Sequence, residues 1–162
     1  TGKTFEFKVF KIHPFSVPHD AYDPVGFFFQ WGEDDLFNPP GSLAWVTDLG
    51  FVPNLVRERI RKAQILVLES NYCPHMLEAD NKRPWSLKQR IRSRHGHLSN
   101  HSTFELLNSY NSSCWQKIFI MHLSKDCNDV NLVCQQFKEL NGQGNRFKTF
   151  VIDPLTAEPH LV

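Results

Sequence analysis

Three short apolar runs in this sequence each lead to an ionisable side chain, and this pattern constrains the fold more than any other feature. Residues 43–46 lead to Asp48, residues 15–18 lead to His19, and residues 118–121 lead to His122. Because an α/β sheet gathers its chemistry outside the carboxyl ends of its strands, we expect these three side chains to lie close together. Two imidazoles and one carboxylate can bind a metal ion, although the same residue types also cap or hydrogen-bond the ends of strands.

The rest of the chain alternates between segments of strand and helix character. Apolar residues recur at helical spacing over 52–63 and over 130–140. The run 64–69 is apolar on both faces, as a central strand of an α/β layer should be, and it ends on Glu69. Strands are also expected at 5–9, 23–30 and 148–152. This alternation predicts an α/β fold, and residues 1–162 suit a single domain.

Composition limits the classes of partner. The 18 Lys and Arg residues nearly balance the 17 Asp and Glu residues, so a net charge of +1 gives no global attraction to a polyanion, and phosphate binding must be local. No apolar run approaches the roughly 20 residues that cross a membrane. The four cysteines form no CxxC pair. We therefore expect reduced thiols in a cytoplasmic protein without a secretory leader.

Positive charge is concentrated between residues 82 and 94. This segment has no acid and six basic residues, Lys82, Arg83, Lys88, Arg90, Arg92 and Arg94. Because Trp85, Leu87 and Ile91 give it an apolar side, it is predicted to be a short helix with a basic face. Charge runs commonly form only a solvated surface, and that interpretation stays open beside a functional one.

The loop that follows the basic segment favours a phosphate site. Residues 94–100 carry two histidines around Gly96, and a glycine lets the backbone approach a ligand closely. The stretch from Ser102 to Glu105 resembles a capping box, which predicts a helix whose first N–H groups could bind an anion. We therefore expect Arg90, Arg94 and this loop to bind phosphate.

Four phrases occur in order along the chain. They are Pro-His-Asp-Ala-Tyr-Asp-Pro-Val-Gly at 18–26, Val-Thr-Asp-Leu-Gly at 46–50, Gly-His-Leu-Ser-Asn at 96–100 and Met-His-Leu-Ser at 121–124. This succession resembles the metallo-β-lactamase fold hydrolases, and most closely the YycJ-like branch of their nuclease-type members, which are related to ribonuclease Z. The resemblance covers nearly the whole chain, and the four phrases together are far more specific than any one of them.

The resemblance implies a site for two divalent metal ions, zinc or manganese. His19 matches a metal-binding histidine of the family, Asp48 matches the carboxylate that bridges the two ions, and His122 matches the last histidine ligand. Two such ions can hold a hydroxide at neutral pH and neutralise a phosphodiester as it is attacked.

The resemblance also implies roles for residues beside the metals. His97 matches the histidine that donates a proton to the leaving oxygen in the phosphodiesterases of the family, and Glu69 would orient that imidazole and keep it protonated. Ser99 and Asn100 are expected to bind the substrate phosphate together with the two arginines named above.

The sequence departs from the family in one respect. Family members carry a His-x-His-x-Asp-His signature that supplies most ligands of both metals, and this chain contains no such motif. The chain therefore resembles only the C-terminal half of the αββα sandwich of the family. We expect a complementary N-terminal half to complete the site. Without that half, a face of Phe, Val and Ile would be exposed, and the chain would be unstable or oligomeric.

Three functions are open on this basis. The first is a metal-dependent phosphodiesterase, an exonuclease acting on DNA or RNA, whose site the N-terminal half completes. The second is a non-catalytic binding or docking remnant of the fold. The third is a metallohydrolase of a small substrate, which would need no basic face at 82–94. Salt-sensitive binding to single-stranded nucleic acid would separate this third function from a nuclease.

Overall fold

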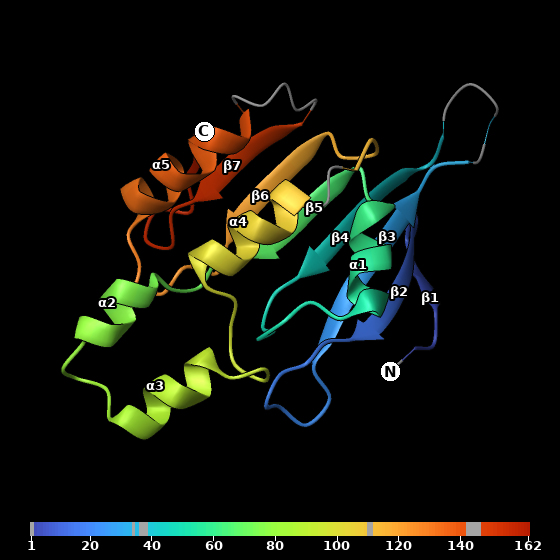
Figure 1. Ribbon diagram of the computed structural model, residues 1–162. Helices are drawn as coiled ribbons and strands as arrows, with labels where there is room; N and C mark the ends of the chain where they lie inside the picture. Colours follow the sequence, from blue (N-terminus) through green and yellow to red (C-terminus); the bar gives the residue numbers. More distant parts are fainter. Residues whose placement is uncertain (1, 34, 36–38, 110–111, 142–146) are drawn as a thin grey trace.

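The computed structural model describes all residues except 1, 34, 36–38, 110–111 and 142–146. Within the described residues, one sheet of eight strands carries helices on one of its faces (Figure 1). The strands are β1 (Phe5–Phe7), β2 (Phe10–Ser16), β3 (Val25–Trp31), β4 (Gly41–Val46), β5 (Ile65–Glu69), β6 (Lys117–Met121), β7 (Lys148–Ile152) and β8 (Pro159–Leu161). The helices are α1 (Asn54–Arg61), α2 (Pro74–Ala79), α3 (Trp85–Arg92), α4 (Asn100–Ser109) and α5 (Val130–Asn141). None of the helices that the structure describes combines the length and hydrophobicity of a membrane-spanning segment.

The strands lie in the sheet in the same order as in the chain. Strands β1 to β4 form antiparallel hairpins, whereas β4 to β7 run parallel and β8 returns antiparallel to β7. Successive right-handed crossovers that add strands in one direction place their helices on one face of a sheet. Accordingly, α1, α4 and α5 cover the same face (Figure 1). The predicted α/β class is confirmed.

The pairing register sorts the strand residues onto two faces. On the helix-covered face, Phe28 pairs with Ala44, Ala44 with Leu66, and Leu66 with Ile118, and all four are buried. A neighbouring row on the face without helices pairs Phe27, Trp45, Val67, Phe119 and Phe150 in succession. In that row Trp45 is 41% exposed. The apolar face expected from the sequence is therefore present.

The N-terminal hairpin differs from the expectation of one strand over 5–9. The chain leaves β1 at Phe7, turns at Lys8 with a φ of 53°, and continues as β2. This second strand passes through Pro14, which by sequence reasoning belongs to a stiff connection. The pairing with β1 reaches only to Ile12, so Pro14 lies where this edge of the sheet is open and its missing N–H costs no bond to β1.

Helices α1 and α5 bury the residues that their spacing predicts, whereas α3 does so only in part, since Ile91 packs against a small apolar cluster but Trp85 does not. In α1, Val56 and Ile60 are fully buried. In α3, the predicted apolar residue Trp85 is 59% exposed, whereas Lys88 is buried and its ammonium donates to the carbonyl of Glu78 at 2.7 Å. The helix also spans fewer residues than the predicted 82–94. It packs through the stem of a lysine rather than through an aromatic ring.

Candidate active site

The carboxyl ends of three adjacent parallel strands carry three of the expected functional residues. Asp48 lies just beyond β4, Glu69 ends β5, and His122 directly follows β6. His97 comes from the loop before α4, and His19 comes from the loop between β2 and β3. Asp48, Glu69, His97 and His122 each offer a possible metal-binding atom, and these four atoms lie within 4.8 Å of one another. The structure thus brings together groups that are far apart in the sequence.

The Asp48 carboxylate lies between two imidazoles. Its Oδ1 atom is 3.9 Å from Nε2 of His19 and 3.6 Å from Nε2 of His122. Two ligands each about 2.1 Å from a tetrahedral zinc ion are about 3.4 Å apart. The separation between His122 and Asp48 is close to this value, whereas His19 lies farther from Asp48 and outside the group of four; imidazole and carboxylate donors suit a divalent ion.

All three imidazoles have their Nδ1 atom occupied within the protein. Nδ1 of His19 lies 3.0 Å from the carbonyl oxygen of Gly96, which can only accept a hydrogen bond. Nδ1 of His122 and Nδ1 of His97 lie 2.9 Å and 3.2 Å from Oε2 of Glu69. Because a neutral imidazole that donates through Nδ1 has its lone pair on Nε2, these contacts direct Nε2 toward a metal or substrate.

Glu69 connects the parts of the site. It is fully buried and accepts backbone hydrogen bonds from Asp48 at 2.9 Å, Leu49 at 3.2 Å and Leu98 at 2.7 Å. Burial opposes ionisation of Glu69, but the hydrogen bonds from His122 and His97 and the Leu98 N–H outweigh it and lower its pKa to about 2. With so many donors on its oxygens, Glu69 fixes the orientation of the His97 and His122 rings and has little capacity left to bind an ion itself.

The same contact changes the protonation of His122. Its hydrogen bond with Glu69 raises the pKa of His122, burial opposes this shift, and the charge of Asp48 adds to it. In the absence of a metal ion, the imidazole is therefore held more firmly in its charged form than a free histidine would be.

Close backbone contacts hold the loops of the site together. Asp20 N donates to the carbonyl of His95 at 3.0 Å, and its carboxylate accepts from Nε of Arg90. A Cβ at Gly50 would lie 2.1 Å from the carbonyl oxygen of Ser93, and one at Gly96 would lie 2.1 Å from that of Ile91. Glycine at these two positions allows the loop after β4 and the histidine loop to pack against their neighbours.

Curated relatives are similar to this sequence over almost its whole length. The exodeoxyribonuclease WalJ of Streptococcus pneumoniae is 32% identical over 163 residues, which cover 98% of this chain and 58% of the relative. The exodeoxyribonuclease YycJ of Bacillus anthracis is 31% identical over 158 residues, covering 94% of this chain and 57% of the relative. The chain thus spans less than two thirds of the length of these relatives. No family model matches the sequence.

Solved structures show the same architecture at low sequence identity. The metallo-β-lactamase fold protein YhfI of Bacillus subtilis superposes with a TM-score of 0.54 at 10% identity, over 85% of this chain and 45% of its own. This chain has the architecture of part of the metallo-β-lactamase fold. Zinc-bound PqqB of Methylobacterium extorquens also matches, with a TM-score of 0.54 at 18% identity over 91% of this chain and 47% of its own.

Within this metallo-β-lactamase fold, Ser99 and Asn100 do not lie free to receive phosphate. The Ser99 hydroxyl accepts from the N–H of Ser102 at 3.1 Å and so caps α4, which begins at Asn100 instead of after Ser102 as the predicted capping box requires. The Asn100 side chain is buried and bonds to Ser70 and Asn128 at 2.7 Å and 2.8 Å. Both residues support the base of the site.

The two arginines expected at the phosphate site lie at its rim. The Arg90 guanidinium is paired with Asp20, and the Arg94 guanidinium lies 4.0 Å from the centre of the Phe51 ring. Other cations of the basic segment also have acidic partners, since Arg83 contacts Asp80 and Asp126 at 2.8 Å each. The sequence alone does not show these pairings, because the acids lie outside the segment.

A cavity of about 410 Å³ opens from the candidate metal-binding group toward the α2–α3 hairpin. Besides the site histidines, Tyr72, Arg83 and Cys127 contribute to its wall. Asn71, at its edge, donates from its amide to the carbonyl of His122 at 2.9 Å. Sequence reasoning assigns no role to Asn71 or to Asp20, although Asp20 directly follows His19 and Asn71 lies two residues after Glu69.

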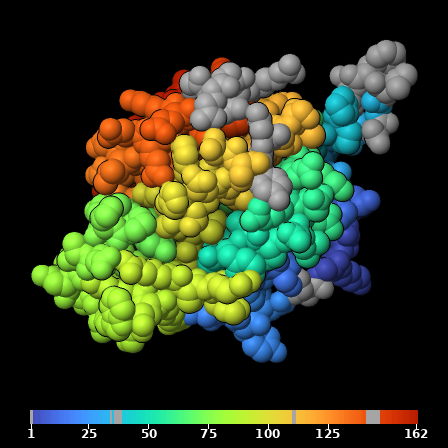
Figure 2. All heavy atoms as spheres, viewed as in Figure 1, coloured from blue at the N-terminus to red at the C-terminus, as the bar shows by residue number. Residues whose placement is uncertain are grey.

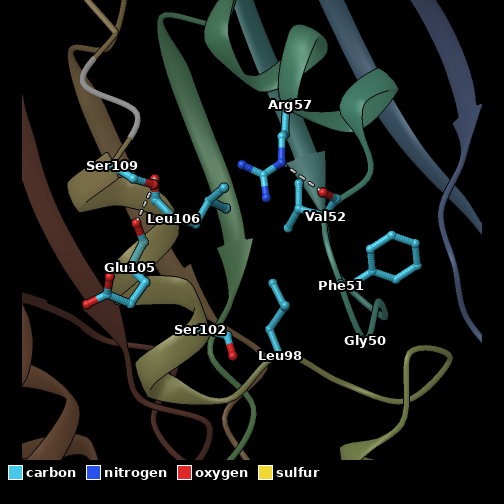
Figure 3. Close-up of a pocket in the computed structure, with 9 residues that line it drawn as sticks. All are labelled: Gly50, Phe51, Val52, Arg57, Leu98, Ser102, Glu105, Leu106 and Ser109. Atoms are coloured by element: carbon cyan, nitrogen blue, oxygen red, sulfur yellow. Dashed lines mark hydrogen bonds between the residues drawn. The ribbon is translucent and has the colours of Figure 1, made fainter.

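A second cavity, of about 250 Å³, lies between α1 and α4 (Figure 3). Arg57 reaches along it and donates from Nε to the carbonyl of Val52 at 2.9 Å. Its lining includes Gly50 and Leu98, which are close in sequence to the site, but none of the site histidines. This cavity is therefore distinct from the candidate active site.

Proposed function

We propose that the complete protein is a metal-dependent phosphodiesterase that removes nucleotides from the ends of nucleic-acid strands. The observation that supports this most directly is the set of Nε2 atoms of His19 and His122 around Oδ1 of Asp48, with every Nδ1 atom occupied. The two curated relatives named as exodeoxyribonucleases support a nucleic-acid substrate.

His19, Asp48 and His122 would hold the divalent ions, which we propose to be two zinc or manganese ions. When bound, such ions supply a hydroxide at neutral pH and neutralise the charge of the diester. The remaining ligands would come from the complementary N-terminal half. The face that contains Trp45, Phe119 and Phe150 is the surface on which that half would pack.

His97 is proposed as the catalytic acid. In its imidazolium form, His97 would donate through Nδ1–H to Glu69 and keep a proton on Nε2 that it can give to the leaving oxygen. Glu69 itself is buried and fully engaged, and it acts as a positioning residue for both His97 and His122. Arg90 and Arg94 at the rim are proposed to contact the substrate phosphate after exchanging their present partners.

The experiment uses the complete protein purified with its metal, and it follows release of nucleotides from an end-labelled strand. His97→Ala should lower kcat by about 10²- to 10⁴-fold with unchanged metal content. His122→Ala should instead release metal. His160→Ala, at an exposed histidine on β8, serves as the matched control and should change neither. A metal-loaded protein that releases no nucleotide from DNA or RNA would refute the proposed function.

A metallohydrolase of a small substrate is the second candidate. It is favoured by the pairing of Arg83, Arg90 and Arg92 with carboxylates, which leaves less charge for a polyanion than the sequence suggests. Turnover of a small phosphodiester at full rate, together with failure to degrade any oligonucleotide, would select this candidate.

A further inference from the structure

Two exposed aromatic side chains lie on the segments that border the candidate site. Among the described residues, the other exposed aromatic rings belong to strands of the sheet, namely Phe5, Phe7, Phe10 and Trp45. In contrast, Tyr22 lies in the β2–β3 loop three residues after His19, and Trp85 begins α3. Tyr22 is fully exposed, and Trp85 is 59% exposed. Neither ring contributes to a core.

The segments that carry these rings are joined beside the site. Arg90 of α3 pairs with Asp20, and Asp20 is bonded through its N–H to His95. At about 1.5 Å per helical residue, Trp85 lies about 8 Å along α3 from Arg90. The β2–β3 loop and α3 lie next to each other at the lower edge of the molecule in Figure 2. We call Tyr22, Trp85 and Arg90 the aromatic rim.

The charge around the aromatic rim is positive but largely paired. Lys82, Arg83, Arg90 and Arg92 all contact carboxylates, which belong to Asp20, Glu78, Asp80 and Asp126. Lys88 donates to a backbone carbonyl, and Arg94 lies over Phe51. The remaining charge is complementary to a polyanion, but it is too small for phosphate contacts to supply most of the binding. An aromatic ring offers a second contribution, because an unpaired base can stack on it.

We propose that the aromatic rim binds single-stranded nucleic acid by stacking unpaired bases on Trp85 and Tyr22 as the strand end enters the site. This inference rests on the proposed function, since it assigns the substrate of the same site. A single strand is the specific occupant because bases in a duplex are already stacked on their neighbours. Arg90 guides the backbone between the two rings and the metal-binding group.

The test uses the complete protein with its metal, a single-stranded oligodeoxynucleotide and the small diester bis(p-nitrophenyl) phosphate. Trp85→Ala should raise KM and the dissociation constant Kd for the oligonucleotide about tenfold, the size of effect seen when one base–aromatic stack is lost. Trp85→Phe should restore most of the affinity. Tyr22→Ala should have a smaller effect in the same direction, and the double variant should be weaker than either.

Two controls separate stacking from damage to the fold. The small diester has no strand of bases that could extend from the site onto α3, so its turnover should fall far less than that of the oligonucleotide. Leu155→Ala, at a side chain 77% exposed in the β7–β8 turn, should leave both reactions unchanged. Binding of the oligonucleotide should also quench tryptophan fluorescence in the wild type and less so in Trp85→Phe.

The inference and the proposed function can fail separately. Unchanged oligonucleotide affinity in both Trp85→Ala and the double variant would refute the proposal that the aromatic rim binds single strands, even if the protein is a nuclease. Equal losses on both substrates would also overturn it, because they would indicate a structural role for the rings. A protein that binds the oligonucleotide through Trp85 but hydrolyses neither substrate would refute the proposed phosphodiesterase and leave the binding surface standing.

Discussion

Asp48 and His122 adopt a backbone conformation that side chains other than glycine seldom take. Their φ angles are 60° and 61°, in the left-handed region. Both residues lie just beyond the end of a strand and turn a ligand atom toward the same point, where Oδ1 of Asp48 and Nε2 of His122 lie 3.6 Å apart. Because such strain persists where the surrounding structure requires it, the two outliers support a functional role for this pair.

Substitutions at Asp48 should separate backbone strain from metal binding. Asp48→Gly should be about 1 kcal/mol more stable than Asp48→Ala, because glycine adopts a positive φ without steric cost. Both variants should lose metal to the same extent. Urea unfolding of the metal-free proteins and metal analysis of the purified proteins would check this. Equal stability of the two variants would show that the left-handed conformation carries no strain.

Replacing Glu69 should lower the free energy of unfolding at neutral pH and weaken the dependence of that free energy on pH in acid. The pKa of Glu69 lies near 2 instead of 4.5, so its charge stabilises the metal-free fold by about 3 kcal/mol. That contribution is complete above pH 4.5 and is lost as the pH falls toward 2. Glu69→Gln should therefore lower the free energy of unfolding at pH 7 and flatten its decline in acid.

Chemical unfolding between pH 2 and pH 7, with chelator present, measures both effects of this variant. Glu139→Gln, at an exposed position of α5, is the matched control and should follow the wild type. If the variant loses stability in acid as steeply as the wild type, another carboxylate must be responsible.

At the level of elements, the α2–α3 hairpin is attached by a charged cluster instead of a large apolar interface. Arg83 contacts Asp80 and Asp126, and these contacts lower the pKa of both carboxyl groups. The small apolar cluster beneath the hairpin contains Tyr72, Leu77 and Cys127. The hairpin should consequently be the part of the site that opens first.

Arg83→Met should loosen the hairpin and remove part of its sensitivity to acid. Since both carboxyl groups have lowered pKa values, the ion pairs stabilise the hairpin above their ordinary pKa of 3.8 and fail as the pH falls below it. Hydrogen exchange of residues 74–92 should be faster in the variant at pH 6, and the difference should shrink near pH 3. Lys138→Met on α5 should show neither change.

The sequence predicts the elements that are regular and misses those set by distant contacts. Strands β4, β5 and β6, with Asp48, Glu69 and His122 at their ends, follow from apolar runs and strand-end chemistry. Strand β2 could not be recognised, because Pro14 argues against a strand unless the open edge of the sheet is known. The ion pair of Arg90 with Asp20 spans 70 residues, so the basic segment looks more available in the sequence than it is.

Sequence reasoning also misses the distant contacts within the candidate site. The resemblance assigns Ser99 and Asn100 to phosphate, but their hydroxyl and amide groups are used to cap α4 and to bond Ser70 and Asn128. No local pattern reveals that the helix begins two residues before the predicted capping box. Asp20 and Asn71 carry no periodic signal, and only their contacts in the folded chain indicate a function.

At the scale of the whole molecule, one face of the sheet carries the core and the other carries apolar side chains that none of the described helices covers. Helices cover the row that contains Ala44 and Ile118, which are fully buried. On the opposite face the rings of Phe119 and Phe150 stack with centroids 5.1 Å apart. An apolar face of this kind requires a covering surface in a stable protein.

Residues 1–162 expressed alone should associate through this face. Trp45→Lys should reduce the association measured by sedimentation velocity, because a buried ammonium would destabilise the contact. In the complete protein the same change should lower stability. Leu132→Lys, on α5 with a similar exposure of 45%, is the control and should affect neither. A monomeric isolated chain that melts cooperatively would contradict the expectation.

Every strand lies beside the strands that precede and follow it in the chain. A sheet with this order can lengthen by one strand at a time during synthesis, because each strand pairs with the strand made just before it. The proposed ligands of this chain are also made in sequence order, since His19 and Asp48 are translated well before His122. Of the ligands that this chain would contribute, the last is made only after β6, so most of the sheet can form before that set of three is complete.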